Sequence, residues 1–288
     1  MTLISDIAAP RTLLRLDTLR RLPFALRSGL VILTAEVVIA VLANWLYPGD
    51  PFDLAGAPFL APGDDPQFPL GTDILGRDIA AGLVHGARIS LIVGFSATAL
   101  AVTVGTTVGL LSGYLGGWVD HVLMRVTELF QVIPHFLLAI ILVAILGARI
   151  EFIVLAIGLT SWSMVARLVR AETLALRELD YVSICVAMGG GPVRVMLTHI
   201  LPNVLPPIIV AASILTALAV LTEAGLAFFG LSDSNHISWG GMIGASRDAL
   251  LTAPYMTLIP GLAIVVTVMA LSLIGDGLTA LLRRGDGA

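Results

Sequence analysis

Six apolar runs recur along this 288-residue chain, each about as long as a helix that crosses a lipid bilayer. Such a helix needs about 20 residues to cross about 30 Å of hydrocarbon. The runs occupy residues 29–47, 89–112, 122–147, 152–169, 203–226 and 256–282. They are too long for barrel strands, which show about ten residues of alternating polarity. The sequence therefore predicts an all-α membrane protein with six transmembrane helices.

The composition excludes several classes of function for this chain. Hydrophobic residues make up 57% of the chain and charged residues 12%, which excludes an ordinary soluble domain and gives no basic surface for nucleic acid. All 16 basic residues are Arg, so the chain lacks the Lys that a P-loop uses to reach the phosphates of ATP. It has neither an H-E-x-x-H nor a G-x-S-x-G motif, which argues against an intramembrane enzyme. We find no internal repeat of the kind common in secondary transporters.

The distribution of Arg predicts the orientation. With both termini in the cytoplasm, 12 Arg lie inside and 4 outside, as the positive-inside rule requires. The expected layout is a cytoplasmic N-terminal segment (1–28), a first transmembrane anchor (29–47), an outer acidic loop (48–87) and a transmembrane core (88–282). In a second outer loop, residues 227–255, we expect Trp239, Gly240 and Gly241 to mark turns.

An apolar helix is expected in the main inner segment, near residues 177–189. Tyr181, Ile184, Cys185 and Met188 follow the i, i+3, i+4, i+7 spacing of one helix face, and Leu179, Val182 and Val186 form a second stripe. We expect one stripe to be buried on the bundle and the other to be offered to a partner. Gly189 is expected to end the helix. The alternative is a helix that lies on the membrane surface and binds no protein.

The stretch ARLVRAETLALRELDYVSICVAMGGGPVRVMLTHILPNVLPP resembles the cytoplasmic coupling loop of binding-protein-dependent ABC permeases, in which EAA, three residues, Gly and a later Leu-Pro recur. Gly189, Leu201 and Pro202 match, whereas Ser183, Ile184 and Cys185 replace the EAA triplet. The resemblance implies a type I importer fold with a coupling helix that contacts an ATPase. The expected contact residues are Glu178, Leu179, Asp180, Tyr181, Val182, Ser183, Ile184, Cys185, Met188 and Gly189.

Further blocks resemble the dipeptide, oligopeptide and nickel group of these permeases, and in particular the second of its two permease subunits. These are FPLGTDILGRDIAAGLVHGARISLIVGF, GYLGGWVDHVLMRVTELFQVIPHFLLAI, TEAGLAFFGLS, SWGGMI and IPGLAIVVTVMALSLIGDGL. The resemblance implies a bacterial cytoplasmic membrane protein that imports di- or oligopeptides, with nickel, glutathione and haem as compatible cargoes. The implied partners are a second permease, two ATP-binding subunits that bind ATP and Mg, an extracytoplasmic binding protein and membrane lipid. No cofactor is expected in this chain.

Some single residues have competing interpretations. Acids inside a membrane are candidates for a translocation path, so Glu223 and Glu128 are candidates here, although both are near span ends where water can reach them. Asp73, Arg77 and Asp78 either dock the binding protein or form a turn that satisfies its own backbone. Glu36, inside the first run, is expected to face the bundle. The five His are scattered without metal-ligand spacing, so no metal site is predicted.

Overall fold

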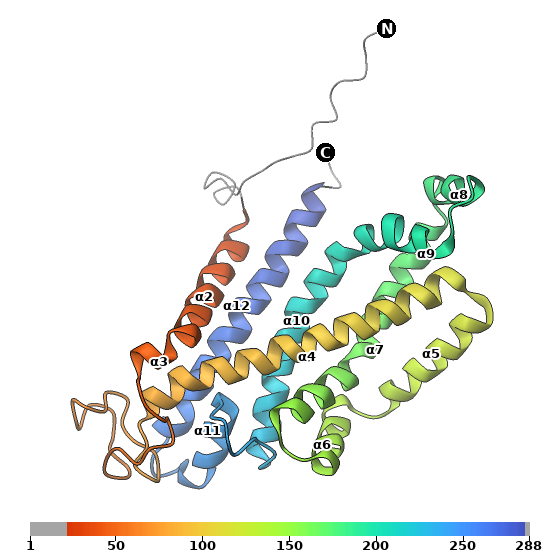
Figure 1. The fold of residues 1–288 in the computed structure, drawn as a ribbon. Coiled ribbons are helices and arrows are strands. Elements are labelled where there is room, and N and C mark those ends of the chain that lie inside the picture. Colours follow the sequence, from red (N-terminus) through yellow and green to blue (C-terminus); the bar gives the residue numbers. More distant parts are fainter. Residues whose placement is uncertain (1–21, 286–288) are drawn as a thin grey trace.

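The computed structural model describes residues 22–285, and the regular structure within that range is helical, with only an isolated bridge between Thr72 and Asp78 (Figure 1). The expected N-terminal segment therefore lies largely outside the described residues. The elements are α2 (Phe24–Val41), α3 (Ala43–Leu46), α4 (Ile79–Leu115), α5 (Gly117–Val132), α6 (His135–Leu146), α7 (Ile150–Arg177), α8 (Asp180–Ala187), α9 (Pro192–Val195), η1 (Met196–Ile200), α10 (Leu201–Phe228), α11 (Trp239–Ser246), η2 (Arg247–Ala249) and α12 (Tyr255–Gly285).

Five of the described helical stretches are long and apolar enough to cross a membrane, and a bent pair makes a sixth candidate. The five are Phe24–Val41, Ile79–Leu115, Ile150–Arg177, Pro192–Phe228 and Tyr255–Leu282. At 37 residues, α4 is about 55 Å long, so it extends well beyond the hydrocarbon layer. It begins at residue 79, inside the predicted outer loop, because the Asp78 side chain caps it by accepting from the Ala80 backbone N–H.

The predicted third span, residues 122–147, is not one straight helix. Its residues form α5 and α6, whose axes differ by 86°. The break falls at Ile133, which is extended at ψ 129°, followed by Pro134. Proline disfavours helical backbone at the residue before it and lacks the N–H that would continue the helix. A continuous span was therefore the wrong prediction here.

Glycines bring α4 and α7 into close contact. Gly105, Gly109 and Gly113 recur every fourth residue on one face of α4, and a Cβ on Gly109 would lie 2.6 Å from the carbonyl oxygen of Ala166. No side chain fits at such a distance, so glycine at this position allows the two backbones to touch. The two helices, which cross the centre of the molecule in Figure 1, form its main frame.

The first helix, α2, packs lengthwise along the last, α12. A Cβ on Gly29 would lie 2.6 Å from the Ala270 carbonyl oxygen, so close approach again depends on glycine. Glu36 accepts a hydrogen bond from the Thr267 hydroxyl on α12 (3.0 Å), which confirms the prediction that Glu36 faces the bundle. α2 begins at Phe24, before the predicted boundary at residue 29.

The bundle has two ends, which are formed by different elements (Figure 1). At one end lie α8, the start of α2 and the end of α12, and we call it the α8 end. At the other lie the loop of residues 47–78 and α11, and we call it the α11 end. Every candidate site on this chain belongs to one of these ends or to the face of α5.

Candidate functional site

α8 is a short helix set off by a turn at each side. α7 ends at Arg177, and the Leu179 carbonyl, in extended backbone, accepts from the Val182 N–H (3.0 Å) to start α8. Gly189 ends it with a φ of +87°, a left-handed conformation that is costly for a residue with a Cβ. The helix is eight residues and about 12 Å long, shorter than the predicted 177–189 segment, part of which belongs to α7.

The two predicted apolar stripes of α8 do not separate into one buried and one exposed stripe, so that prediction was wrong. Val182 is 1% exposed and Cys185 is half-buried, and both pack into a core with Val195 and Ile200. A helix of two turns presents only one narrow line to that core. The remaining apolar side chains are exposed: Leu179, Tyr181, Ile184, Val186 and Met188.

The polar candidates on this segment are exposed as well. Glu178, Asp180 and Ser183 all face solvent in the chain by itself. Asp180 lies in the first turn of α8, where a negative charge interacts favourably with the helix N-terminus. α8 and the residues before it therefore expose acidic and hydroxyl groups together with the apolar side chains.

Beneath α8 the chain passes through the π-helical turn η1 into α10. Cys185 Sγ lies 3.5 Å from His199 Nε2 in this turn. Leu201 and Pro202 then open α10, at positions where the missing proline N–H costs nothing. The Gly and Leu-Pro positions matched at the sequence level thus enclose the unit that α8 packs on. Within residues 22–285, no three His, Cys, Asp or Glu side chains gather closely enough to hold a metal ion.

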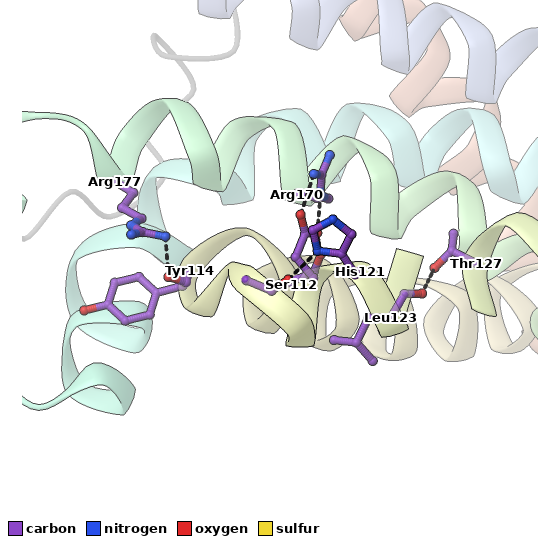
Figure 2. A network of polar contacts seen from close by, with 9 residues as sticks. Ser112, Tyr114, His121, Leu123, Thr127, Arg170 and Arg177 are labelled. Carbon is purple, nitrogen blue, oxygen red and sulfur yellow. Dashed lines mark hydrogen bonds and ion pairs between the residues drawn. The ribbon is translucent and has the colours of Figure 1, made fainter. Parts of the chain in front are cut away.

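A carboxylate on α5 links three helices near the α8 end (Figure 2). Asp120 Oδ1 accepts from Arg170 Nε (2.6 Å) and Asp120 Oδ2 from Arg170 Nη2 (2.7 Å), a bidentate pair between α5 and α7. The Ser112 hydroxyl on α4 donates to the same Oδ1. Beyond it, Arg177 Nη1 donates to the Tyr114 carbonyl (2.9 Å). The part of α7 that leads into α8 is therefore fastened to α4 and α5.

The sequence alone did not predict this network. Asp120 and Arg170 are 50 residues apart, and the sequence identifies Arg170 only as one of the positive charges of the inner segments. The one available signal is the position of each residue at the end of an apolar run, where a charge needs either water or a partner.

At the α11 end, Asp73, Arg77 and Asp78 form a closed turn. Asp73 Oδ1 accepts from the N–H groups of Leu75 (2.8 Å) and Arg77 (2.9 Å). The Arg77 guanidinium lies over the Phe52 ring, 5.0 Å from its centroid. Burial raises the pKa of the Asp78 carboxyl above its ordinary value, and backbone hydrogen bonds at the start of α4 oppose that effect. Asp73 therefore satisfies the backbone of its own turn, whereas Arg77 Nε has no hydrogen-bond partner among the described residues, and docking stays a prediction.

The same turn forms one wall of a cavity of about 300 Å³. The opposite wall comes from the segment that leads into α11 and from α11 itself, about 160 residues further along the chain. The residues that line the cavity include Phe52, Asp73, Arg77, Asp78, Ile79, Asp233, Ser234, His236, Ile237, Met242, Ala245 and Met256. The two segments predicted as outer loops therefore meet around one cavity.

α11 is a helix where turns were predicted at Gly240 and Gly241. A Cβ on Gly240 would lie 2.6 Å from the Cα of Ala224 on α10, so glycine permits the helix to lie directly on α10. The Trp239 N–H donates to Ser90 Oγ on α4 (3.1 Å), and Trp239 Nε1 donates to the Leu83 carbonyl (2.8 Å). Close packing on two helices outweighs the weak helix propensity of glycine.

Glu223 lies beneath α11 and is 3% exposed. Its Oε1 accepts from the Ser238 hydroxyl (2.6 Å), which also accepts from the Gly241 N–H and so caps α11. The other oxygen, Oε2, has no hydrogen-bond partner among residues 22–285. Glu223 thus joins α10 to the start of α11.

Glu128 is in a different setting. It lies on the open face of α5 and accepts from Arg125 Nη1 (3.1 Å), with both side chains largely exposed. The same helix exposes an apolar stripe that recurs every three or four residues and consists of Trp118, Val122, Val126, Leu129 and Val132. Thr127 is the one buried residue of α5, and the face of the helix that carries this stripe is free for contact with lipid or with another chain.

The helical bundle and its two polar ends define a multi-pass membrane protein. Residues 105–285 match the family model described as "Binding-protein-dependent transport system inner membrane component". The chain belongs to this family of transport permeases.

Relatives with assigned names cover nearly the same length. The chain is 37% identical over 255 residues to the glutathione transport system permease protein GsiD of Pectobacterium atrosepticum, which covers 88% of this chain and 84% of that protein. It is 38% identical to the dipeptide transport system permease protein DppC of Alkalihalophilus pseudofirmus, over 87% and 82% of the two chains. It is 35% identical to the nickel transport system permease protein NikC of Escherichia coli, over 88% and 92%.

Proposed function

We propose that this chain is a permease subunit of an ATP-driven importer that carries di- or oligopeptides across the bacterial cytoplasmic membrane. The observation that carries the proposal is α8, whose exposed Ile184 and Met188 side chains lie at an end of a membrane bundle where water is expected. Clustered apolar side chains in such a position favour contact with another protein chain. Family membership supports the same role.

In this proposal the α8 end faces the cytoplasm, together with both termini. The arginines of the described inner segments support this orientation: Arg27, Arg167, Arg170, Arg177 and Arg194. Of the other arginines predicted to lie inside, four belong to residues 1–21, which are outside the described range. Arg125 lies on the open face of α5, and Arg283 and Arg284 belong to the last turns of α12.

Two ATP-binding subunits bind the coupling helices of the two permeases. Tyr181, Ile184 and Met188 are the anchors that this chain offers to a groove, at i, i+3 and i+7. ATP and Mg are bound by those subunits, since this chain has no Lys for a P-loop. Movement of α8 passes into α7 and, through Asp120, into α4 and α5, so the bundle alternates between inward and outward states.

A second, similar permease completes the translocation path. The exposed apolar stripe of α5 supports this partner, because so much apolar surface on one helix suits a protein neighbour as well as lipid. Glu128, exposed on that helix, is the better candidate for the path. Glu223 contributes by holding α11 in place, since it is enclosed by its own chain.

An extracytoplasmic binding protein delivers the cargo at the α11 end, where Asp73, Arg77 and Asp78 belong to the docking surface. The cargo is proposed as peptide because relatives are named for dipeptide, di/tripeptide and glutathione transport. Nickel is the alternative, since NikC is among the relatives, and haem was compatible at the sequence level.

The test is uptake of labelled di- to pentapeptides in cells with and without this chain, measured beside uptake of nickel and haem. We expect deletion to abolish peptide uptake and leave the other two unchanged. Loss of nickel or haem uptake, with peptide uptake intact, would assign the other cargo. Uptake that persists after ATP depletion under an intact proton gradient would favour a secondary transporter.

A further inference from the structure

The cavity at the α11 end has two fixed walls. One wall is the Asp73–Arg77 turn, held by its own backbone hydrogen bonds. The other is held by Asp233, whose Oδ2 accepts from the Ile150 N–H at the start of α7 (3.2 Å) and from His236 Nδ1 (3.3 Å). Burial raises the pKa of Asp233, but hydrogen bonds from the Asn235 and Ile150 N–H groups and from His236 outweigh it, so the pKa lies below its ordinary value. The cavity therefore exists before any partner arrives.

The floor of the cavity is apolar. It is formed by Ile79, Ile237, Met242 and Met256. Gly82 of α4 also lines this floor, and a Cβ added there would lie 3.1 Å from both the Ile237 and the Met242 side chains, so the three residues pack closely. A cavity of about 300 Å³ is at the lower limit of ligand pockets and suits one large side chain. One side chain of a docking partner fits this volume better than a di- or oligopeptide does.

The surroundings of the cavity are acidic. Residues 48–78 contain six Asp, which are Asp50, Asp53, Asp64, Asp65, Asp73 and Asp78, and Arg77 is the one base among them. Asp233 adds a carboxylate on the opposite wall. Complementary charge steers association and selects partners. The partner surface that fits here is basic around an apolar centre.

We infer that this cavity is a socket for one apolar side chain carried on a basic loop of the extracytoplasmic binding protein. The inference rests on the proposed function, because it assigns a contact within the proposed docking surface. It adds the residues of the second wall, from Asp233 to Ala245, which the sequence did not connect with Asp73, Arg77 and Asp78.

The experiment fills the socket without disturbing the core. Ala245, on α11, and Ser234, in the segment that leads into α11, both line the cavity from its second wall and are both exposed, so Ala245→Trp and Ser234→Trp should fold normally. Leu251→Trp is the matched control, since Leu251 is 98% exposed in the same part of the chain and does not line the cavity. The whole importer complex is placed in nanodiscs, and the Kd of the purified binding protein is measured at low and high salt, together with ATP hydrolysis.

We expect each socket variant to raise the Kd at least about tenfold, as loss of a buried anchor does, with no change in the control. Wild-type affinity should fall as salt increases. An unchanged Kd in both socket variants, with the binding protein still stimulating ATP hydrolysis, would overturn the socket and leave the proposed function standing. Absence of any binding to the wild-type complex would overturn both. Binding of a labelled dipeptide without the binding protein, lost in Ala245→Trp, would reassign the cavity to cargo.

Discussion

The Asp120 carboxylate accepts hydrogen bonds from two other helices, so its charge matters more than its shape. In Asp120→Asn, one of the two oxygens becomes an NH₂ that faces an Arg170 donor. Both side chains are partly enclosed, at 17% and 33% exposed, so we expect the variant to lose about 1–3 kcal/mol of stability. The measurement is the thermal midpoint of the purified permease in detergent.

The control for that change lies on the same helix. Glu128→Gln also removes a carboxylate from an arginine pair, but Glu128 and Arg125 are 59% and 81% exposed, and surface pairs contribute little. Its thermal midpoint should match the wild type. Equal midpoints for both variants would mean that the three-helix link does not stabilise the fold.

The hydrogen bond between Glu223 and Ser238 is expected to stabilise the start of α11. Glu223→Gln keeps an acceptor for the Ser238 hydroxyl, whereas Glu223→Leu leaves that hydroxyl buried without its partner. We expect hydrogen–deuterium exchange to speed up at residues 239–246 in the Leu variant and stay slow in the Gln variant. Equal protection of α11 in both variants would show that glycine packing alone holds the helix.

At the scale of elements, α8 offers the sharpest test of the proposed coupling. Ile184 is 57% exposed, so Ile184→Asp should leave the chain folded, unlike a change at the buried Val182. If α8 enters a groove in the ATPase, an unpaired carboxylate there should cost several kcal/mol. We expect less ATPase to copurify and substrate-stimulated hydrolysis to fall.

Ser183→Ala is the matched control on the same helix, because Ser183 is exposed and has no apolar anchor to lose. It should leave copurification and hydrolysis near wild-type values. Wild-type values for Ile184→Asp as well would mean that α8 lies on the membrane surface and binds no ATPase.

The elements that the sequence predicted correctly are those whose formation depends on residues within one segment of the chain. Apolar length is a local signal that predicted the spans, and the helical spacing of apolar residues is another that predicted a helix near residues 177–189. Gly189 could be predicted because a helix end needs left-handed backbone. The proline at residue 134 was visible, but the surrounding hydrophobicity favoured an unbroken span, and the 86° bend was missed.

The remaining features depend on contacts between distant segments. Gly240 and Gly241 suggest turns in the sequence, and only the fold shows that Ala224 on α10 lies against Gly240 and favours a helix there. Asp120 pairs with a residue on another helix, and the cavity joins two loops that the sequence describes separately. No spacing within one segment carries that information. For this reason the docking surface was predicted from one wall only.

At the scale of the whole molecule, α4 connects both candidate sites. Its N-terminus is capped by Asp78 beside the cavity, and near its other end Ser112 donates to Asp120. Gly105, Gly109 and Gly113 hold the C-terminal part of α4 directly against α7. A displacement of α7 near α8 therefore has a stiff route to the α11 end, about 55 Å away along one helix.

This connection can serve transport only if the α8 end and the α11 end face opposite sides of the membrane. We predict that they do. Single Cys residues are introduced at Asp64, Asn235 and Glu178 after the native Cys185 is replaced by Ser. All three positions are exposed in the fold, so the membrane alone decides which of them a membrane-impermeant thiol reagent can reach. In right-side-out vesicles we expect labelling at positions 64 and 235 and none at 178, because arginine-rich segments stay in the cytoplasm. Detergent should then expose position 178, which shows that this thiol is reactive. Labelling of position 178 alone in intact vesicles would reverse the orientation, and α8 would then lie on the side where no ATPase can reach it.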